Sequence, residues 1–488
     1  MNNIFDKLKA YSDSDYYAFH MPGHKRNLDL MDGTSPYRID ITEIDGFDDL
    51  HHAEGILKEA QERAAEVYHA DETHFLVNGS TVGILSAILG TTEKGDSILV
   101  ARNCHKSVYH AIYLNELDPV YLYPKFDTEQ GLSTEIDAAD VQKALEEHPK
   151  IRAVMIVSPT YDGVVSDIEK IAEIVHAKGC PLIVDEAHGA HFGFDPYFPK
   201  SANIYGADLV INSLHKTLPA LTQTALLHVN GDMVKRRKVK QYLDMLQTSS
   251  PSYILMASID ACIGMLEETL ETHSDARSDY KYKNIFSEYA NRIEALRKDL
   301  KRLKYLKIIQ TDNTDRYDRS KFVISVKHAP MSSHELYEIL LHRYHLQMEM
   351  LAGTYVLAMT TVGDTQEGLD RLRDALLEID KEIDTRQGRP AAIETDLPLS
   401  GRQPALEKVW TIAEAVNRRD KIQKRSFEDS IGCISVEYAY LYPPGSPLIV
   451  PGERITKEAV EILHWYQEHD FSIEGLQAED GIEVWIDG

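Results

Sequence analysis

The 488-residue sequence has few cysteines and no long apolar run. Its four cysteines, Cys104, Cys180, Cys262 and Cys433, lie far apart and form no Cys-x-x-Cys pair. This spacing argues against a disulfide framework and a bound metal, and it indicates a reducing compartment. No run of about 18 apolar residues is present, so we expect no membrane span. The N-terminus, Met1–Asp6, has no basic segment followed by an apolar one. We therefore expect no signal peptide and a cytoplasmic location.

Positive charge is also scarce, because the formal net charge is −26. Non-specific binding to nucleic acid depends on cationic contacts to phosphate, so this balance argues against a nucleic-acid partner. The hydrophobic content of 43% and the charged content of 27% are ordinary for a soluble globular protein. The length allows several domains with a large core.

Apolar runs bounded by turn residues predict buried strands of a parallel sheet. They cover residues 73–77, 97–101, 151–157, 181–184 and 207–212. Helical periodicity follows several of them, and Ser166–Glu169 is typical of a capping box that begins one of these helices. Strand, helix and strand in close succession indicate right-handed βαβ units. The fold class is therefore α/β with a mostly parallel sheet.

Polar residues follow these strands where each strand ends: Ser80 and Thr81, His105, Asp185, and the run Ser213-Leu214-His215-Lys216. The carboxyl ends of parallel strands share one edge of the sheet, and ligands bind at that edge. A lysine and an aspartate on neighbouring strand ends suit pyridoxal phosphate. The lysine forms an imine with the cofactor, and the aspartate keeps the ring nitrogen protonated. Lys216 and Asp185 are the candidates.

Several of these motifs have a second interpretation. Gly79-Ser80-Thr81 is either a phosphate cradle at a helix N-terminus or an ordinary N-cap, and it is not a Walker A loop. His105 is either a helix-start residue bonded to backbone or an imidazole lying over a cofactor ring. We interpret His20–Lys25 as a surface loop in preference to a loop beside a binding site. We interpret Val234–Lys240 as a solvated helix face.

The expected domains are an N-terminal segment (1–55), a cofactor-binding large domain (56–280), a small α/β domain (281–385), a linker (386–404) and a C-terminal α+β domain (405–488). In the last domain we expect a helix over 406–419, strands near 434–442 and a helix after Thr456.

Seven ordered motifs carry a resemblance to a known family: His20–Lys25, Asn78–Thr81, Arg102–Ser107, Asp185–Gly189, Ser213–Lys216, Thr248–Pro251 and Tyr442–Pro447. Through them the sequence resembles the Orn/Lys/Arg decarboxylases, pyridoxal-phosphate enzymes of the aspartate-aminotransferase-type fold (fold type I). The family core starts within about twenty residues of Met1. The chain is therefore similar to the compact Gram-positive-type members, which lack the N-terminal wing domain.

The resemblance implies roles for individual residues. Lys216 would form the imine, Asp185 would pair with the pyridinium, His105 would stack on the ring, and Ala187 would lie beside it. Phosphate ligands would be Ser80, Thr81, Ser213 and His215, with Ser249 and Ser250 reaching from a partner subunit. This implies a homodimer with active sites at its interface, or a larger assembly built from that dimer.

A decarboxylase turns the substrate carboxylate out of the ring plane into a site that does not grip it. The expected strand 355–361 contains no arginine, which argues against an aminotransferase. The proton that returns to Cα could come from Lys216, His188 or His215. For the distal cation, the candidates are Glu437, Asp48 and Asp49, although base rates of burial favour a solvated carboxylate at each position.

The leading hypothesis is decarboxylation of a basic L-amino acid to the corresponding di- or polyamine and CO2, with lysine slightly ahead of arginine and ornithine. One alternative keeps the cofactor and changes the reaction to transamination or aldol-type cleavage. Another is a non-catalytic regulator that binds the cofactor. The intact pair of Asp185 and Lys216 argues against a regulator.

Overall fold

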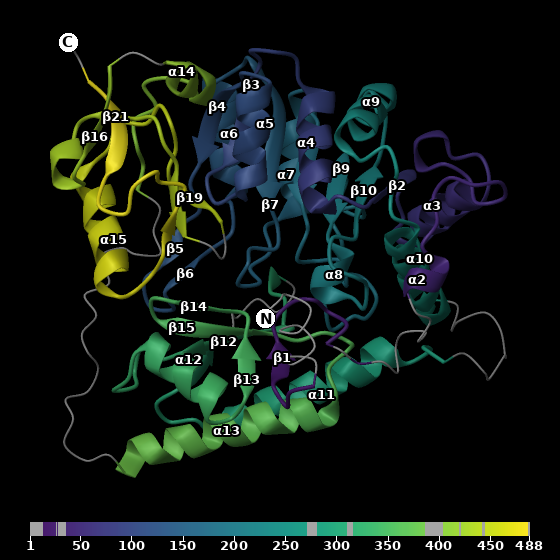
Figure 1. The fold of residues 1–488 in the computed structure, drawn as a ribbon, viewed down its shortest axis with the longest axis vertical. Coiled ribbons are helices and arrows are strands. Elements are labelled where there is room, and N and C mark those ends of the chain that lie inside the picture. Colours follow the sequence, from purple (N-terminus) through teal and green to yellow (C-terminus); the bar gives the residue numbers. More distant parts are fainter. Residues whose placement is uncertain are drawn as a thin grey trace.

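A seven-stranded sheet forms the centre of the computed structural model, which describes residues 13–25, 27, 36–270, 281–309, 316–385, 404–418, 421–441 and 445–486 (Figure 1). The strand order is β2-β10-β9-β8-β7-β3-β4, and β10 alone runs antiparallel to its neighbours. The strands are β2 (Glu72–Leu76), β3 (Ser97–Ala101), β4 (Asp118–Leu122), β7 (Ile151–Val157), β8 (Leu182–Asp185), β9 (Leu209–Asn212) and β10 (Ala225–Val229). The mostly parallel α/β fold is thus confirmed, while β4 and β10 were not predicted.

Helices pack on both faces of this sheet: α3 (Ile56–Val67), α4 (Gly79–Thr91), α5 (Lys106–Leu114), α6 (Ala138–Glu147), α7 (Ile168–Ala177), α8 (Leu214–Thr217), α9 (Arg236–Leu246) and α10 (Tyr253–Leu270). The central helix, α4, is almost wholly buried and lies against α5 and α9. At Gly90 a Cβ atom would come within 2.9 Å of the Val239 Cα. Glycine therefore permits the close approach of α4 to α9.

The small unit is an antiparallel sheet of order β11-β12-β15-β14, and α11 and α13 lie beneath it in Figure 1. Its elements are α11 (Ile285–Leu300), β11 (Lys307–Ile309), β12 (Lys321–Ser325), α12 (Ser333–His342), β13 (Leu346–Met348), β14 (Met350–Ala352), β15 (Tyr355–Met359) and α13 (Gln366–Thr385). The N-terminal strand β1 (Tyr17–Phe19) pairs in parallel with β13. The start of the chain is therefore attached to the small unit.

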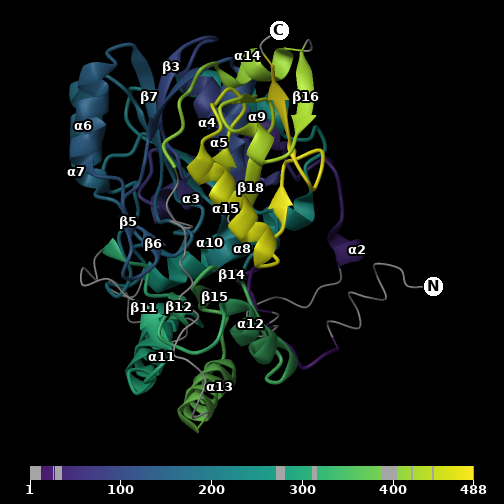
Figure 2. The ribbon, with the colours of Figure 1, turned by 90° about the vertical axis from the view of Figure 1, so that its left-hand side faces the viewer.

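The C-terminal unit covers one side of the large sheet (Figure 2). It contains two three-stranded sheets, of orders β16-β21-β17 and β19-β18-β20. Its elements are α14 (Ile412–Asn417), β16 (Ile422–Arg425), η5 (Glu428–Ser430), β17 (Ile434–Ser435), β18 (Ala439–Leu441), β19 (Pro447–Ile449), α15 (Lys457–Glu468), β20 (Ile473–Glu474) and β21 (Ile482–Trp485). The short elements α2 (Pro36–Ile39), η2 (Leu50–His52), β5 (Phe126–Asp127) and β6 (Leu132–Ser133) complete the described chain.

Three local predictions were wrong. The loop His20–Lys25 is not a surface connection, because Gly23 and Lys25 are buried and the Lys25 ammonium donates to the carbonyl oxygens of His20 and Met359. The helix expected over 406–419 is only α14, since the preceding backbone bonds to Gly452 instead.

The third error concerns the start of α7. Its N-cap is Asp167, which accepts from the Lys170 amide, while the Ser166 hydroxyl accepts from Ile136. Most of the predicted linker, residues 386–403, lies outside the described residues, as do residues 442–444 of the last family motif. The domain boundaries stay a prediction. Within the described chain, no helix is both long and apolar enough to cross a membrane.

Candidate active site

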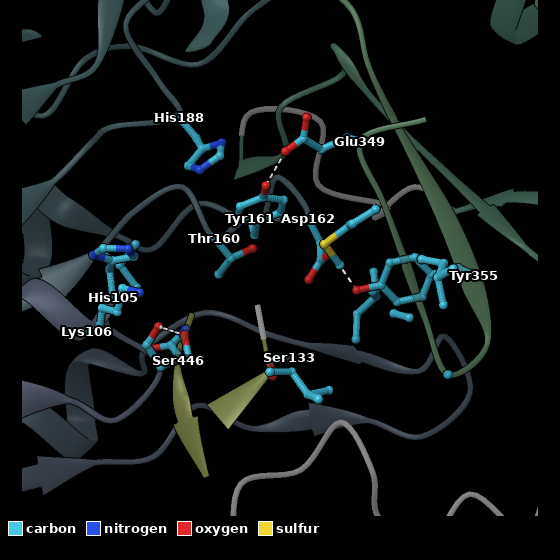
Figure 3. Close-up of a pocket in the computed structure, with 18 of the residues that line it drawn as sticks. His105, Lys106, Ser133, Thr160, Tyr161, Asp162, His188, Glu349, Tyr355 and Ser446 are labelled. Atoms are coloured by element: carbon cyan, nitrogen blue, oxygen red, sulfur yellow. Dashed lines mark hydrogen bonds between the residues drawn. The ribbon is translucent and has the colours of Figure 1, made fainter. Parts of the chain in front are cut away.

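A pocket of about 940 Å³ lies where the three units meet, at the carboxyl edge of the large sheet (Figure 3). Residues that follow β2, β3, β7, β8 and β9 line one side of it. The small unit contributes residues around β14, and the C-terminal unit contributes Leu441, Ser446, Leu448 and residues after α15. The convergence of strand ends expected from the sequence is therefore present, and the predicted residues Ser80, Thr81, His105, Asp185, Ala187, His188, His215 and Lys216 all line this pocket.

Lys216 lies in α8, the single helical turn that follows β9. Its Nζ is 3.0 Å from His188 Nε2. Burial lowers the pKa of this lysine, and the carboxylates of Asp185 and Glu349 oppose the effect. The amine is therefore easier to deprotonate than a surface lysine, which suits a nucleophile that forms imines.

Asp185 ends β8 and pairs in register with Ile211 of β9, the strand that leads to Lys216. Its carboxylate is buried and accepts from the Ala187 amide at 3.1 Å. Burial raises the pKa of this carboxyl, and the nearby Lys216 lowers it. A ligand cation next to Asp185 would also stabilise the ionised carboxylate.

His105 is a helix-start residue bonded to backbone, as one interpretation of its position expected, and its place over a cofactor ring stays a prediction. It is the N-cap of α5, where its Nδ1 accepts from the Ser107 amide at 3.2 Å, and it also lines the pocket. Burial lowers its pKa to about 3, so the imidazole is neutral at physiological pH. Ser80 and Thr81 form the first turn of α4, whose backbone N–H groups lie at the pocket.

Ser213 is the N-cap of the turn that carries Lys216, and His215 lies within that turn. The His215 Nδ1 lies 2.9 Å from the Thr224 carbonyl oxygen, and burial lowers the pKa of its ring to about 4. The Ser213 hydroxyl is buried without a hydrogen-bond partner among the described residues. A buried hydroxyl of this kind is costly unless a ligand satisfies it.

Six predicted residues do not line the pocket: the buried Ser213 and five others. Ser249 and Ser250 are exposed on this chain. Asp48 accepts from the backbone amides of Glu54, Gly55 and Leu57, and Asp49 caps η2.

Glu437 is buried and accepts from the amides of Gln477 and Glu483. These three carboxylates, Asp48, Asp49 and Glu437, hold turns together within this chain. They do not line the pocket of this chain, and their assignment to the distal cation stays a prediction.

The structure adds pocket residues that the sequence did not single out. Tyr161 donates to Glu349, and Tyr355 donates to Asp162 (Figure 3). Tyr161 and Asp162 follow the predicted strand 151–157, so the strand-end rule could have found them. Glu349 lies between two short strands of the small unit, and no local pattern marks it.

Comparison with known proteins identifies one protein family along most of the chain. The sequence model of the Orn/Lys/Arg decarboxylase major domain matches residues 2–339, and that of the Orn/Lys/Arg decarboxylase C-terminal domain matches residues 402–484. The uncharacterized protein YaaO of Bacillus subtilis is 36% identical over 468 residues, which cover 94% of this chain and 93% of the relative. The arginine decarboxylase of Bacillus subtilis is 31% identical over 469 residues, which cover 94% of this chain and 92% of the relative.

Among solved structures, lysine decarboxylase A from Pseudomonas aeruginosa matches with a TM-score of 0.77 at 20% identity, covering 99% of this chain and 80% of that one. At this identity the likeness shows the fold. Two family models and near full-length relatives agree, and the chain belongs to the Orn/Lys/Arg decarboxylase family.

Proposed function

We propose that the pocket binds pyridoxal 5'-phosphate and that the enzyme decarboxylates a basic L-amino acid. The observation that carries this proposal is the position of Asp185 and Lys216 on the ends of the adjacent strands β8 and β9, within one pocket. A carboxylate and an amine in this arrangement suit the ring nitrogen and the aldehyde carbon of that cofactor.

The residues around this pair fit the cofactor. The unpartnered Ser213 hydroxyl and the first turn of α4, with Ser80 and Thr81, would hold the phosphate. His215 would add a further contact. His105 offers a neutral imidazole to the ring face, and the methyl group of Ala187 takes little room beside it.

When bound, the cofactor supplies an electron sink for the charge left on Cα as CO2 departs. Asp185 would hold the proton on the ring nitrogen, because an opposite charge nearby favours the protonated form. Lys216 would supply the amine that exchanges with the substrate amine. The candidates for returning a proton to Cα remain Lys216, His188 and His215, all at the pocket.

The lining of the pocket favours decarboxylation of a basic substrate. Among the described residues that line it, none is an arginine. The substrate carboxylate therefore lacks the bidentate clamp that would stabilise its ground state. Asp162, Glu349 and Asp470 line the same pocket, and each could pair with the distal cation of a basic substrate.

For the substrate, we rank arginine first and lysine second. The sequence favoured lysine slightly. The near full-length relatives at 31–32% identity are named arginine decarboxylases, whereas those named lysine decarboxylases match only 53–54% of the chain. We also propose a homodimer in which Ser249 and Ser250, exposed here, reach the phosphate of the partner subunit.

The test is a competition assay. Purified enzyme with pyridoxal phosphate receives equal arginine, lysine and ornithine, and we expect CO2 together with one dominant amine, agmatine. Keto acid without CO2 would favour transamination instead. Binding of the cofactor without turnover of any of the three would favour a regulator.

A further inference from the structure

A second lysine, Lys321 of β12, lies behind His188 on the side away from Lys216. Its side chain has no exposed surface, and its Nζ is 3.5 Å from His188 Nδ1 and 4.0 Å from Asp318 Oδ2. On the other edge of the same ring, Nε2 is 3.0 Å from Lys216 Nζ. One buried imidazole thus lies between two lysine amines.

The hydrogen bonds available at His188 limit how many protons His188, Lys216 and Lys321 can carry together. A neutral imidazole has one N–H donor and one acceptor nitrogen, and an ammonium group can only donate. Two ammonium groups cannot both donate to the same ring. Burial also lowers the pKa of His188 well below its usual value, and both lysines act in the same direction, so the ring is neutral.

The carboxylates around each lysine indicate which of them carries the charge. Asp318 is completely buried, and the neighbouring His191, whose Nε2 is 3.1 Å away, helps to lower its pKa to about 2. This ionised group is the main stabiliser of the Lys321 ammonium, and Glu349 adds to it. Burial still lowers the pKa of Lys321, to about 8, with Lys216 and Lys25 acting in the same direction.

On the Lys216 side of the His188 ring, a positive charge is less well stabilised. Lys216 faces Asp185 and Glu349, and Glu349 acts on both lysines. Burial raises the pKa of Asp185, whereas the pKa of Asp318 is lowered to about 2, so Asp318 is the stronger counter-ion. His188 is also approached by the neutral rings of His105, His215 and Tyr161, none of which adds a positive charge. A proton is therefore better held on Lys321 than on Lys216.

We propose that Lys321 is a positioning residue that fixes His188 with Nδ1 accepting and Nε2–H donating, and thereby keeps Lys216 an unprotonated amine. The inference rests on the proposed function, because it takes Lys216 to be the imine-forming lysine. It assigns a role to a residue of the small unit that does not touch the reacting atoms.

The experiment measures how fast the apoenzyme captures pyridoxal phosphate as a function of pH, since only a free amine reacts. In Lys321→Met we expect the pH of half-maximal rate to rise, with the rate at pH 7.5 falling about tenfold for each pKa unit gained by Lys216. Lys321→Gln retains an N–H donor for Nδ1 and should stay closer to the wild type. Lys307→Met, which removes an exposed lysine from the neighbouring strand β11, should change nothing.

A second readout uses the wild-type protein and does not depend on the Lys321 variants folding. In wild-type apoenzyme labelled with 15N-histidine, the ring signals that vanish in His188→Gln should report the Nε2–H tautomer near pH 7.5. An Nδ1–H tautomer or a protonated ring overturns the proposal. So does a Lys321→Met enzyme with the wild-type pH dependence, or equal behaviour of the Met and Gln variants.

Failure of the proposed function would look different. If Lys216→Met still captured the cofactor covalently, Lys216 would not be the imine-forming residue, whatever the Lys321 variants did. If Lys216→Met abolished capture and Lys321→Met left its pH dependence unchanged, only the role of Lys321 would fall.

Discussion

Arg102 Nη2 lies 3.0 Å from Glu453 Oε2, and both side chains are only 1% exposed. The pair joins the end of β3 to the C-terminal unit, where Arg102 also donates to the Leu448 carbonyl oxygen and Glu453 accepts from the Val450 amide. Arg102 opens one of the family motifs, and its contacts give that position a structural role beside the pocket residue His105.

Removing one partner of this pair should be strongly destabilising. In Arg102→Met the Glu453 carboxylate stays buried without its cation, so we expect a loss of about 3–5 kcal/mol in the free energy of unfolding. Urea unfolding measures it. Lys424→Met, which breaks the exposed pair with Asp480, should leave the free energy of unfolding nearly unchanged, because water screens that pair. Equal losses in the two variants would contradict the prediction, and Arg102→Met/Glu453→Met should recover part of the loss.

Asp185→Asn should impair catalysis more than stability. An amide cannot favour the protonated ring nitrogen as a carboxylate does, and an adjacent opposite charge is worth about 1–3 pKa units. We therefore expect a fall in kcat of at least about tenfold, together with a changed visible spectrum of the bound cofactor.

The adjacent Glu186→Gln is the matched control. Glu186 bonds to Ser201, Ala202 and Asn212, and burial raises its pKa to about 7. This variant should retain the wild-type spectrum. If both variants altered the spectrum alike, the assignment of Asp185 to the ring nitrogen would fail.

Gly23→Ala should loosen the contact between the N-terminal arm and the turn that carries Lys216. The Gly23 amide donates to the His215 carbonyl oxygen at 2.6 Å, and a Cβ atom at Gly23 would lie 2.6 Å from the Leu218 oxygen. We expect a destabilisation of about 1–3 kcal/mol and weaker binding of the cofactor. Gly264→Ala, in α10 with open space around it, should instead stabilise by up to about 1 kcal/mol. Thermal unfolding and cofactor titration of both variants provide the check.

Acid should destabilise the apoenzyme through its buried neutral histidines. His228 lies between Thr73 and Asn212, and burial lowers its pKa to about 3, against about 6.5 in an unfolded chain. Its contribution is complete above pH ~6.5 and is lost as the pH falls toward about 3, by at most ~1.4 kcal/mol per pH unit. His105 and His215 act with the same sign.

Unfolding free energies measured between pH 7.5 and 5.5 should therefore decrease toward acid. His228→Gln should reduce the slope, whereas a substitution of the exposed His148 to Gln should leave it unchanged. A slope that is the same in all three proteins would show that His228 is already protonated in the folded chain or is not buried as described.

The sequence by itself determined five of the seven strands of the central sheet and the residues that follow them at the functional edge. Apolar runs located β3 and β7 at their observed bounds, and located β2, β8 and β9 to within a residue or two. Because parallel strands present their carboxyl ends together, residues as distant as Ser80 and Lys216 could be assigned to one pocket without any knowledge of their contacts.

Only the tertiary structure decided which other side chains lie at the pocket with these residues. Glu437 and Asp48 are carboxylates of the kind that bind a cation. In the fold, however, their oxygens accept hydrogen bonds from backbone amides of distant or neighbouring segments. Lys321 lies in an apolar strand 133 residues from His188, and it meets that ring because the small unit closes against the large sheet. Local periodicity reports which face of an element is buried. It carries no information about which distant side chain completes a hydrogen bond there, and the state of Lys216 depends on that pairing.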